Sequence, residues 1–555
     1  MTAQLSSYCA DDRTPWFDLM PPPHWEIPDH PDHGLGLFEA ALASHPDGPA
    51  VAYFDRVLSY SDIDIESSAF AAALRERGFL PGDRLSVYMQ NIPAFAIAML
   101  AAWKAGGSLV PINPMNRARE LAVVLNDARP HTLVLEPGLV ADALERVDKD
   151  SYHPSLVVVA SPYDYQTRDD MRVMPPRLQP AGYAAWIDLV APHRGVAAPV
   201  LPRDPDDCAL LVYTSGTTGI PKAAVIPHRA ATRASTYAEK VYDLKPHEPI
   251  IALAPVFHTT GLMCTMVSAL RLASPIIYTY RFQPEVSVEA IREYRPTYTA
   301  AAPTAYIALT QAEGAKIEDF ASFKACAIGG AAVSPALVAR LKAEFGVPAQ
   351  SGFGMTEVGG AVSVVPFEWR DRTPVDSESG AISIGIPFPG VHMWIADDNG
   401  APLPAGQMGE IIVDAPTNMT AYWNRPEATA ETLRSDGLRT GDIGFMDADG
   451  WFYLVDRKKD MIVAGGYKVW PREVEDVLYG HSAVLEAAVV GVPHEYRGET
   501  VKAYIRLRPG QSATTEDLAA FCRENLAAYK RPAEFAIVDD LPKTASGKIM
   551  RSALR

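Results

Sequence analysis

The chain has 555 residues, of which 48% are hydrophobic and 21% are charged, so it holds apolar material for several cores and exceeds one ordinary domain. Its formal net charge of −17 argues against a general binder of nucleic acids or anionic membranes, although it leaves room for a local phosphate site. The five cysteines are scattered without a CxxC pair, which indicates neither a zinc site nor a disulfide framework and favours a reducing, cytoplasmic compartment.

The first part of the chain alternates helical and strand patterns. Amphipathic periodicity predicts helices over 37–44 and 61–77 and a strand over 84–89, and the apolar run 92–103 predicts a buried helix that stops at Gly106 and Gly107. That run is shorter than the ~20 residues that a membrane-spanning helix needs. Further strands are expected at 108–112, 132–135, 156–159 and 209–213. The alternation predicts an α/β fold, a large N-terminal composite of parallel and mixed sheets covered by helices.

The character of the sequence changes near Asp456. The stretch 455–471 is charged, then rich in glycine, and ends at Pro471, which is typical of a linker or hinge. Predicted helices at 472–479 and 515–528 and strands at 485–492, 500–507 and 534–538 follow it and make a compact α+β unit. We therefore expect an N-terminal domain over 1–456, a hinge over 457–463 and a small C-terminal domain over 464–555.

The first motif with chemical content is YTSGTTGIPKAA, residues 213–224, which follows an apolar strand. Its glycines let several backbone N–H groups turn toward one anion, and its hydroxyls and its lysine add donors and charge. It is not a Walker loop, because Lys222 does not directly follow the second glycine. A polar turn after a buried strand is the plain alternative, but this density of donors favours phosphate binding.

Three further motifs are weak when each is taken alone. In Gly329-Gly330-Ala331 and SGFGMTE (351–357), an aromatic ring beside glycines can lie against a flat base, and a threonine and a carboxylate can hold a phosphate and Mg²⁺. In TGD (440–442) the carboxylate can accept from ribose hydroxyls, although an Asp after Gly is usually a turn. In PKTASGKIMR (542–551) Lys548 lies in a short glycine-containing loop, where a lysine is normally a solvated charge.

Together with APVFHTTGL (254–262) and VDRKKDMIVAGGYKVWPREVE (455–475), these motifs resemble the adenylate-forming superfamily, which contains acyl-CoA and aryl-CoA synthetases, firefly luciferase and the adenylation domains of peptide synthetases. The resemblance spans residues 37–551, with every motif in the family's order. It implies an acid–thiol ligase that uses ATP, Mg²⁺ and coenzyme A. It also implies that the domain over 1–456 binds ATP and the acyl substrate and that the domain over 464–555 is a mobile lid. A carboxylate would first form acyl-AMP and pyrophosphate, and CoA would then form acyl-CoA and release AMP.

The resemblance also implies roles for individual residues. The ATP β- and γ-phosphates would be held by Thr214, Ser215, Gly216, Thr217, Thr218, Gly219 and Lys222. The adenine pocket would be lined by Gly330, Ala331 and Phe353, where many relatives have tyrosine, and the ribose would be held by Asp442 and Arg457. The catalytic residues would be Lys548, His258 near the reacting carboxylate, and Thr356 at the α-phosphate, with Glu357 as the magnesium ligand. Lys459 matches the hinge position, and Gly465 and Gly466 would lie near the CoA pantetheine tunnel.

The acyl pocket is expected among Phe257, His258, Pro303, Thr304 and Gly329. The segments that contain these residues, 254–262, 299–309 and 329–330, have mostly small, apolar side chains. They carry no charge apart from that of a protonated His258, which disfavours amino acids and dicarboxylates as substrates. VDRKKDMI is similar to fatty acyl-CoA ligases, so a medium- or long-chain fatty acid is favoured, with an aromatic or alicyclic acid as the alternative.

Two other functions stay open at this stage. An enzyme with the same first step could pass the acyl group to a carrier-protein thiol or an amine, and a non-catalytic relative could bind nucleotide as a sensor. The joint presence of Glu357, Asp442, Arg457 and Lys548 argues against the sensor. The sequence allows a homodimer, and it predicts neither a nucleic-acid partner nor a transmembrane segment.

Overall fold

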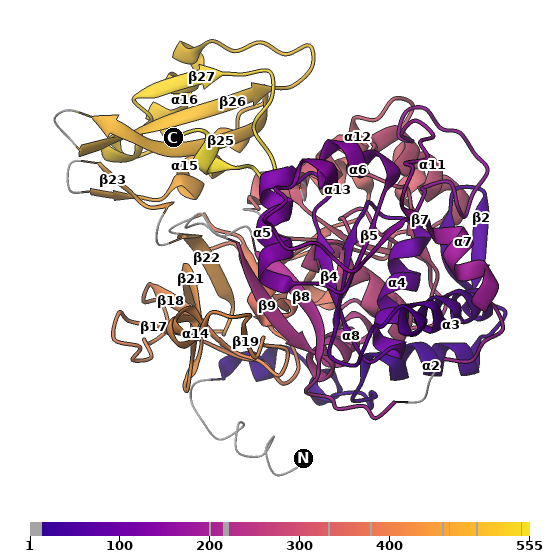
Figure 1. Cartoon of the computed structure of the whole chain (residues 1–555). Helices are drawn as coiled ribbons and strands as arrows, with labels where there is room; N and C mark the ends of the chain where they lie inside the picture. Colours follow the sequence, from indigo (N-terminus) through magenta and orange to yellow (C-terminus); the bar gives the residue numbers. More distant parts are fainter. Residues whose placement is uncertain are drawn as a thin grey trace.

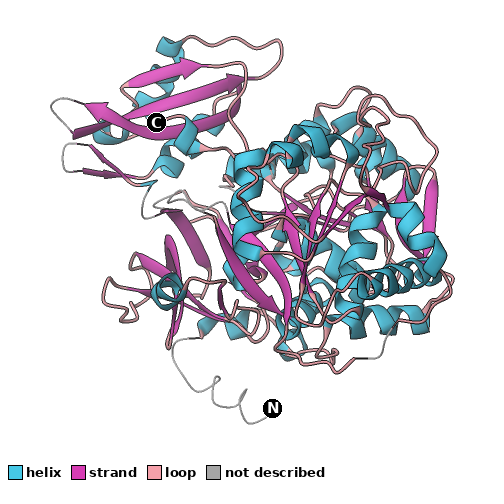
Figure 2. Ribbon diagram, viewed as in Figure 1, coloured by secondary structure: helices cyan, strands magenta, loops and turns pink. Residues whose placement is uncertain are grey.

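The computed structural model describes residues 14–198, 201–214, 221–330, 333–377, 380–457, 460–464, 467–494, 498–544 and 547–555. Their strands form sheets of 14, 8 and 5 strands. Figures 1 and 2 show a large body in which helices cover the first two sheets, and a smaller domain, drawn in yellow in Figure 1, that carries the third sheet. The predicted α/β body with a small C-terminal α+β domain is confirmed.

The 8-stranded sheet lies in the first half of the body and is parallel except at one edge. Its order is β19 (Ala421–Tyr422), β9 (Lys222–Pro227), β8 (Cys208–Thr214), β4 (Ser108–Ile112), β3 (Arg84–Tyr88), β5 (Thr132–Leu135), β6 (Leu156–Val159) and β7 (Ala184–Ala185). The helices of this part are α3 (Tyr60–Glu76), α4 (Pro93–Lys104), α5 (Ala118–Ala128), α6 (Pro137–Asp142) and α7 (Trp186–Val190). The predicted elements of this region match the observed ones to within one residue at each end.

The 14-stranded sheet changes from parallel to antiparallel at β14 (Ala349–Met355), which pairs parallel with β13 (Ala325–Ile328) and antiparallel with β15 (Gly360–Val364). Its parallel part adds β12 (Tyr298–Ala301), β10 (Ile250–Ile251), β11 (Ile276–Tyr278) and β1 (Pro49–Tyr53), with β2 (Arg56–Ser59) antiparallel at the edge. Its antiparallel part adds β16 (Ser383–Pro387), β22 (Phe452–Arg457), β21 (Gly437–Met446), β18 (Gly409–Asp414), β17 (His392–Ala396) and β20 (Leu433–Arg434).

The helices around this sheet complete the body. They are α2 (Gly34–Ser44), α8 (His228–Val241), α9 (Thr259–Gly261), the π-helical turn η5 (Leu262–Val267), α10 (Ser268–Arg271), α11 (Pro284–Tyr294), α12 (Pro303–Thr310), α13 (Pro335–Phe345) and α14 (Pro426–Thr432). Short 3₁₀ turns are η1 (Pro15–Leu19), η2 (Pro22–Trp25), η3 (Leu144–Arg146), η4 (Ala191–His193), η6 (Ile317–Phe320), η7 (Thr356–Val358) and η8 (Phe367–Trp369). No helix in the described parts of the chain combines the length and the apolar character needed to cross a lipid bilayer.

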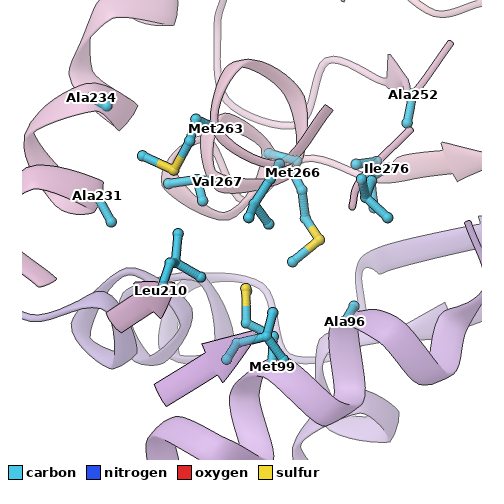
Figure 3. Packing of buried hydrophobic residues seen from close by; sticks show 14 of the residues in the cluster. Ala96, Met99, Leu210, Ala231, Ala234, Ala252, Met263, Met266, Val267 and Ile276 are labelled. Atoms are coloured by element: carbon cyan, nitrogen blue, oxygen red, sulfur yellow. The ribbon is translucent and has the colours of Figure 1, made fainter. Parts of the chain in front are cut away.

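One hydrophobic cluster joins the two sheets of the body. Figure 3 shows its centre, where Met99 of α4 and Leu210 of β8 face Met263, Met266 and Val267 of η5. The unbranched methionine side chains fill the irregular space between helices that arrive from different parts of the chain. Because this core is continuous, the edges of the two sheets are held in a fixed relation, and the loops at those edges form one site.

The small C-terminal domain has a core of its own. Its sheet runs β24 (Tyr467–Val469), β23 (Ile462–Ala464), β26 (Gly498–Leu507) and β25 (Val484–His494), and β27 (Glu534–Ile537) pairs with β26. It is covered by α15 (Pro471–Tyr479) and α16 (Thr515–Asn525), followed by the turns η10 (Ala528–Lys530) and η11 (Arg551–Ala553). We call this domain, residues 460–555, the lid.

Three expectations about this region are corrected. The stretch read as a linker contains the hairpin β23–β24, because Ile462, Ala464 and Val469 point inward and are buried in the lid core. Arg457, expected at the start of the hinge, is the last residue of β22. In addition, the helix predicted to end at residue 528 ends at Asn525, where Leu526 becomes extended.

Candidate active site

The predicted phosphate loop joins two antiparallel strands of the 8-stranded sheet. Thr214 ends β8, Lys222 begins β9, and the two are cross-strand partners, with the Thr214 hydroxyl donating to the Lys222 carbonyl at 3.3 Å. Ser215, Gly216, Thr217, Thr218 and Gly219 lie outside the described residues. The hairpin base therefore brings Thr214 and Lys222 together, and the loop they close stays a predicted phosphate site.

Lys222 and Glu357 lie on two sides of one tyrosine. The Lys222 ammonium lies 4.3 Å from the centre of the Tyr422 ring, and the Tyr422 hydroxyl donates to Glu357 Oε1 at 2.7 Å. Burial, and then the Glu357 charge, raise the pKa of Tyr422, so it stays a donor at neutral pH. No motif marks Tyr422, since it reaches the site through the two-residue strand β19, which pairs with β9.

His258 and Thr356 are linked through the start of α9. The Thr259 hydroxyl donates to Thr356 Oγ1 at 3.1 Å, and the Thr260 N–H donates to His258 Nδ1 at 3.3 Å. Burial, and then the nearby Lys548 charge, lower the pKa of His258 to about 4. The imidazole is therefore neutral at pH 7 with its proton on Nε2, and it can donate a hydrogen bond but is no proton reservoir.

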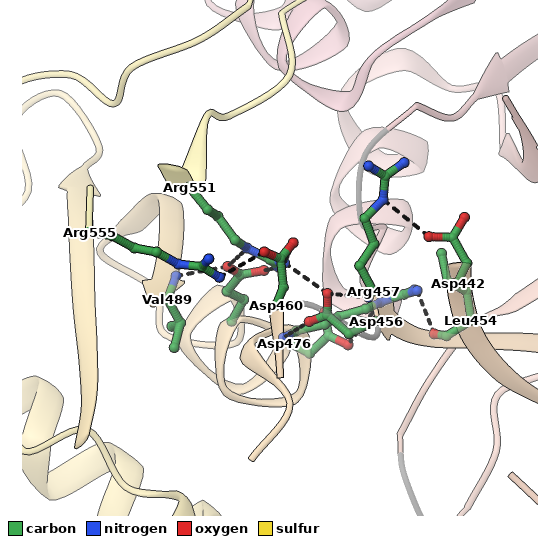
Figure 4. A network of polar contacts seen from close by, with 11 residues as sticks. Asp442, Leu454, Asp456, Arg457, Asp460, Asp476, Val489, Arg551 and Arg555 are labelled. Carbon is green, nitrogen blue, oxygen red and sulfur yellow. Dashed lines mark hydrogen bonds and ion pairs between the residues drawn. The ribbon is translucent and has the colours of Figure 1, made fainter. Parts of the chain in front are cut away.

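Asp442 and Arg457 are cross-strand partners in β21 and β22. Arg457 Nε donates to Asp442 Oδ1 at 3.1 Å, as Figure 4 shows, and Asp442 is only 4% exposed. Burial raises the pKa of this carboxyl, while Arg457 and Lys548 act in the opposite direction. The pair forms one polar position at the end of the antiparallel part of the large sheet.

Lys548 reaches this position from the lid. Its loop is closed by hydrogen bonds from the Thr544 N–H to the Lys548 carbonyl, 2.7 Å, and from the Lys548 N–H to Thr544 Oγ1, 3.1 Å. Burial, and then Arg457, lower the pKa of Lys548 to about 8, although Asp442 opposes this shift. Lys548 thus lies close to the predicted residues Asp442, Arg457 and His258.

The predicted adenine pocket is described in part. Gly330 lies two residues after the end of β13 with φ of +73°, and a Cβ added there would meet open space, so a flat group has room to approach the backbone. Phe353 is 6% exposed and belongs to the main hydrophobic cluster, and its stacking on adenine stays a prediction. Ala331 lies outside the described residues, as do Lys459 at the hinge and Gly465 and Gly466 at the expected pantetheine tunnel.

The residues predicted to line the acyl pocket are separated in part. Phe257 is buried beside His258, and Gly329 lies at the carboxyl end of β13. Pro303 and Thr304 begin α12, and the Thr304 hydroxyl donates to the carbonyl of Gly547 at 2.8 Å. The structure therefore places Thr304 against the lysine loop of the lid.

A small cavity lies under α8, and none of the predicted acyl-pocket residues lines it. Its walls are Ala234, Tyr237, Ala238, Tyr242, Met263, Cys264, Ser268, Tyr298, Gly359, Ala361 and Phe388, and none of them is charged. It adjoins the Thr259–Thr356 contact, because a Cβ built on Gly360 would lie 3.6 Å from Cys264 Sγ and 3.9 Å from Thr259 Cγ2. Helix α8 carries no recognisable motif, so its part in this cavity was not predicted.

The fold and this site define a class: a two-domain nucleotide-binding enzyme whose small domain delivers a lysine to the larger one. The chain matches the model of the AMP-binding enzyme family over residues 38–423 and that of the AMP-binding enzyme C-terminal domain over 473–548. It therefore belongs to the AMP-binding enzymes, in the acyl-CoA synthetase branch of the adenylate-forming superfamily, and the resemblance drawn from the motifs is confirmed.

Similar proteins cover nearly the whole chain. The long-chain-fatty-acid–CoA ligase of Bacillus subtilis is 34% identical over 525 residues, which are 93% of this chain and 92% of that protein. The feruloyl-CoA synthase of Amycolatopsis sp. is 33% identical over 532 residues, 94% and 99% of the two chains. The crystal structure of an anthranilate CoA ligase in complex with anthranoyl-AMP has a TM-score of 0.83 at 27% identity and covers 95% of this chain and 97% of its own.

Proposed function

We propose that this AMP-forming acyl-CoA ligase activates an apolar carboxylic acid, with a medium- or long-chain fatty acid as the substrate. The single observation that supports this function best is the meeting of Lys548 with Asp442, Arg457 and His258, from three separate parts of the chain. The uncharged cavity next to the Thr259–Thr356 contact supports an apolar acid, because a second charge buried there would have no partner.

In the first step the substrate carboxylate attacks the α-phosphorus of ATP. A new bond forms between the carboxylate oxygen and the α-phosphorus, the α–β bridge breaks, and pyrophosphate leaves. Both partners are anionic, so positioning and charge neutralisation supply most of the catalysis. A lysine about 4 Å from the developing charge, at an effective dielectric near 20, gives roughly 4 kcal/mol of gross Coulomb energy. This corresponds to up to about three powers of ten in rate if it grows in the transition state.

The residues of the body hold the nucleotide. Asp442 and Arg457 bind the ribose, Thr356 contacts the α-phosphate, and Thr214 and Lys222 close the loop that binds the outer phosphates. In neutral His258 the Nδ1 atom accepts from the Thr260 N–H, so the ring proton lies on Nε2. The Nε2–H can donate to the carboxylate without adding a charge. Donors fixed before the reaction begins stabilise charge without reorganising during it.

Mg²⁺ fits this site as a phosphate-bound ion. Within the described residues no group of three or more His, Cys, Asp and Glu gathers into a protein cage for a metal. Mg²⁺ bound to a nucleotide needs only one or two carboxylates, with phosphates and water as the other ligands. Glu357 is held by Tyr422 through one carboxylate oxygen and would use the other for the metal, which would polarise the phosphates.

In the second step the CoA thiol attacks the acyl-AMP carbonyl and AMP leaves. Because the two steps need different surroundings at one carbon atom, the lid turns about Lys459, withdraws Lys548 and presents the Gly465–Gly466 face to the thiol. The mixed anhydride is already activated, so this step needs no strong base.

The aromatic walls of the cavity support a second candidate substrate. Tyr237, Tyr242, Tyr298 and Phe388 surround a space of about 20 Å³, room for one water molecule, so a bound acid must push these rings apart. A flat aromatic acid would stack among them, as the name of the feruloyl-CoA relative supports. A fatty acid, as in the name of the Bacillus subtilis relative, would thread between them.

A panel of acids tests the proposal. The purified protein is incubated with ATP, Mg²⁺, CoA and fatty, aromatic and dicarboxylic acids, and the thioesters are measured by mass. We expect thioesters of fatty acids and none of dicarboxylates. Thioesters of aromatic acids alone would favour an aromatic acid over a fatty acid as the substrate. Acyl-AMP without thioester would assign another acceptor, such as a carrier-protein thiol or an amine.

The assembly and the compartment are also part of this proposal. We expect a cytoplasmic homodimer, and light scattering of the purified protein tests the dimer directly.

A further inference from the structure

The first turn of α12 contacts the loop that carries the catalytic lysine. The Thr304 hydroxyl donates to the carbonyl of Gly547, the residue before Lys548, at 2.8 Å. Thr304 belongs to the body and Gly547 to the lid, and 243 positions of the sequence separate them. The role predicted for Thr304 in the acyl pocket is therefore incomplete, because its hydroxyl makes a hydrogen bond to the lid.

The shape of the loop at Gly547 suits this contact. Gly547 has φ of +82°, a conformation that residues with a Cβ rarely adopt, and its N–H donates to the Thr544 carbonyl at 2.9 Å. A Cβ at this position would lie 2.6 Å from Thr304 Oγ1. The absence of a side chain lets the Gly547 backbone approach Thr304 closely enough for the hydrogen bond.

A second anchor holds the other end of the loop. Arg551 donates to Glu475 Oε2 at 2.6 Å within the lid and to Asp456 Oδ1 at 2.9 Å in the body. Figure 4 shows the contact with Asp456. Lys548 lies between the two anchors. Arg551 holds the chain just after Lys548, and Thr304 holds the residue just before it.

We propose that Thr304 is a positioning residue for the adenylation step, because its hydroxyl holds Gly547, and with it Lys548, against the body. The inference rests on the proposed two-step function. Without the hydroxyl, the loop loses one directed contact to the body, and Lys548 occupies its reactive position for a smaller share of the time. The thioester step requires Lys548 to leave, so it does not depend on this contact.

The test uses Thr304→Val, which keeps the shape of the side chain and removes the donor. Adenylation is measured as acyl-AMP formed in a single turnover without CoA, and thioester formation is measured separately from supplied acyl-AMP and CoA. We expect adenylation to fall about 3- to 10-fold, the effect of one net hydrogen bond, with thioester formation from acyl-AMP unchanged. Thr304→Ser retains the hydroxyl and should restore most of the adenylation rate.

Thr310→Val is the matched control. Thr310 is the last residue of the same helix, and its hydroxyl donates to the Ile307 carbonyl at 2.8 Å within that helix. Both half-reactions should keep their wild-type rates in this variant. The melting temperatures of all variants, compared with the wild type, separate lost docking from lost folding.

Three outcomes overturn the inference. Equal losses in both half-reactions would make Thr304 a structural residue. A changed KM for the acid or a changed chain-length preference would return Thr304 to the acyl pocket. An unchanged adenylation rate would show that the contact has no function. Failure of the proposed function itself looks different, because the wild-type protein would then form no acyl-AMP.

A double-mutant cycle tests the contact from the lid side. Gly547→Ala forces a Cβ against Thr304 Oγ1 and strains the backbone, so adenylation should fall more than in Thr304→Ala. In the double variant the steric part disappears, and the combined loss should be smaller than the product of the two single losses. A loss equal to that product would mean that the two residues act independently, which contradicts the proposal.

Discussion

The core of the body and the interface between body and lid are built from different interactions. The body is joined by buried apolar side chains from both sheets, and the lid has a separate apolar core. Between them lie directed polar contacts, such as Arg472 Nη2 to the Val333 carbonyl at 2.7 Å and Thr304 to Gly547, while Leu485 is a lid residue that packs into a body cluster. Apolar burial is large and non-directional, whereas a hydrogen bond exchanges with water at little net cost. The interface is therefore suited to a domain that leaves and returns.

Replacing Lys548 with alanine separates the two half-reactions most strongly. Without the ammonium, adenylation should fall by about three powers of ten, and thioester formation from supplied acyl-AMP should continue. Rapid-quench measurement of acyl-AMP and of acyl-CoA gives the two rates. Equal losses in both would remove the assignment of Lys548 to the first step.

Replacing Arg551 with methionine breaks the interface at the base of the loop. Glu475 and Asp456 are both buried, so removal of Arg551 leaves carboxylates without their partner, a change that typically costs about 3–5 kcal/mol. We expect a 10- to 100-fold loss of adenylation and faster proteolysis of the lid. The control is Arg555→Met, since Arg555 is 40% exposed and its pair with Asp460 contributes at most about 1 kcal/mol. Similar losses in both variants would show that burial of the pair is irrelevant.

The pH dependence of adenylation reports the burial of Lys548. In the proposed mechanism the protonated amine is the active form, and burial lowers its pKa to about 8. The kcat/KM for ATP, measured without CoA, should therefore be constant below pH 8 and fall about tenfold per unit above it. In Lys548→Arg the side chain stays charged, so the fall of kcat/KM above pH 8 should disappear even if the rate is lower. If the fall above pH 8 persisted in Lys548→Arg, the titration of a group other than Lys548 would cause it.

The smallest effect is expected at Tyr422, within the body. Tyr422→Phe keeps the ring next to Lys222 and removes the hydrogen bond to Glu357. The Mg²⁺ concentration for half-maximal adenylation should rise about 2- to 5-fold, since one net hydrogen bond is lost. Tyr152→Phe, which removes a hydroxyl bonded to the Pro130 carbonyl, should have no effect. An unchanged magnesium requirement in Tyr422→Phe would weaken the role of Glu357.

The buried parallel sheet was predictable because its strands are continuous apolar runs. β4, β5 and β6 lie where the sequence predicts them, between helices of clear periodicity. The hairpin β23–β24 was missed because its charges and glycines look like a linker, and only three inward side chains mark it as structure. Local patterns thus predict elements with complete or clearly periodic burial, as in α3, and they fail in a short hairpin that few inward side chains mark.

The site residues that belong to sequence motifs could be predicted. Those that reach the site only through tertiary contacts could not. Asp442 and Arg457 were expected together, and their cross-strand pairing brings them together. Tyr422 is brought to Glu357 by a two-residue strand, and Thr304 is turned toward Gly547 by packing across 243 positions. Such contacts depend on how distant elements dock, which no short pattern records.

Detection of the mixed anhydride tests the central claim most directly. The protein is incubated with an apolar acid, ATP and Mg²⁺ without CoA, and acyl-AMP is measured by mass spectrometry in the wild type and in Lys548→Ala. We expect stoichiometric acyl-AMP and pyrophosphate in the wild type and almost none in the variant. Absence of acyl-AMP with every acid, or equal amounts in both proteins, would contradict it.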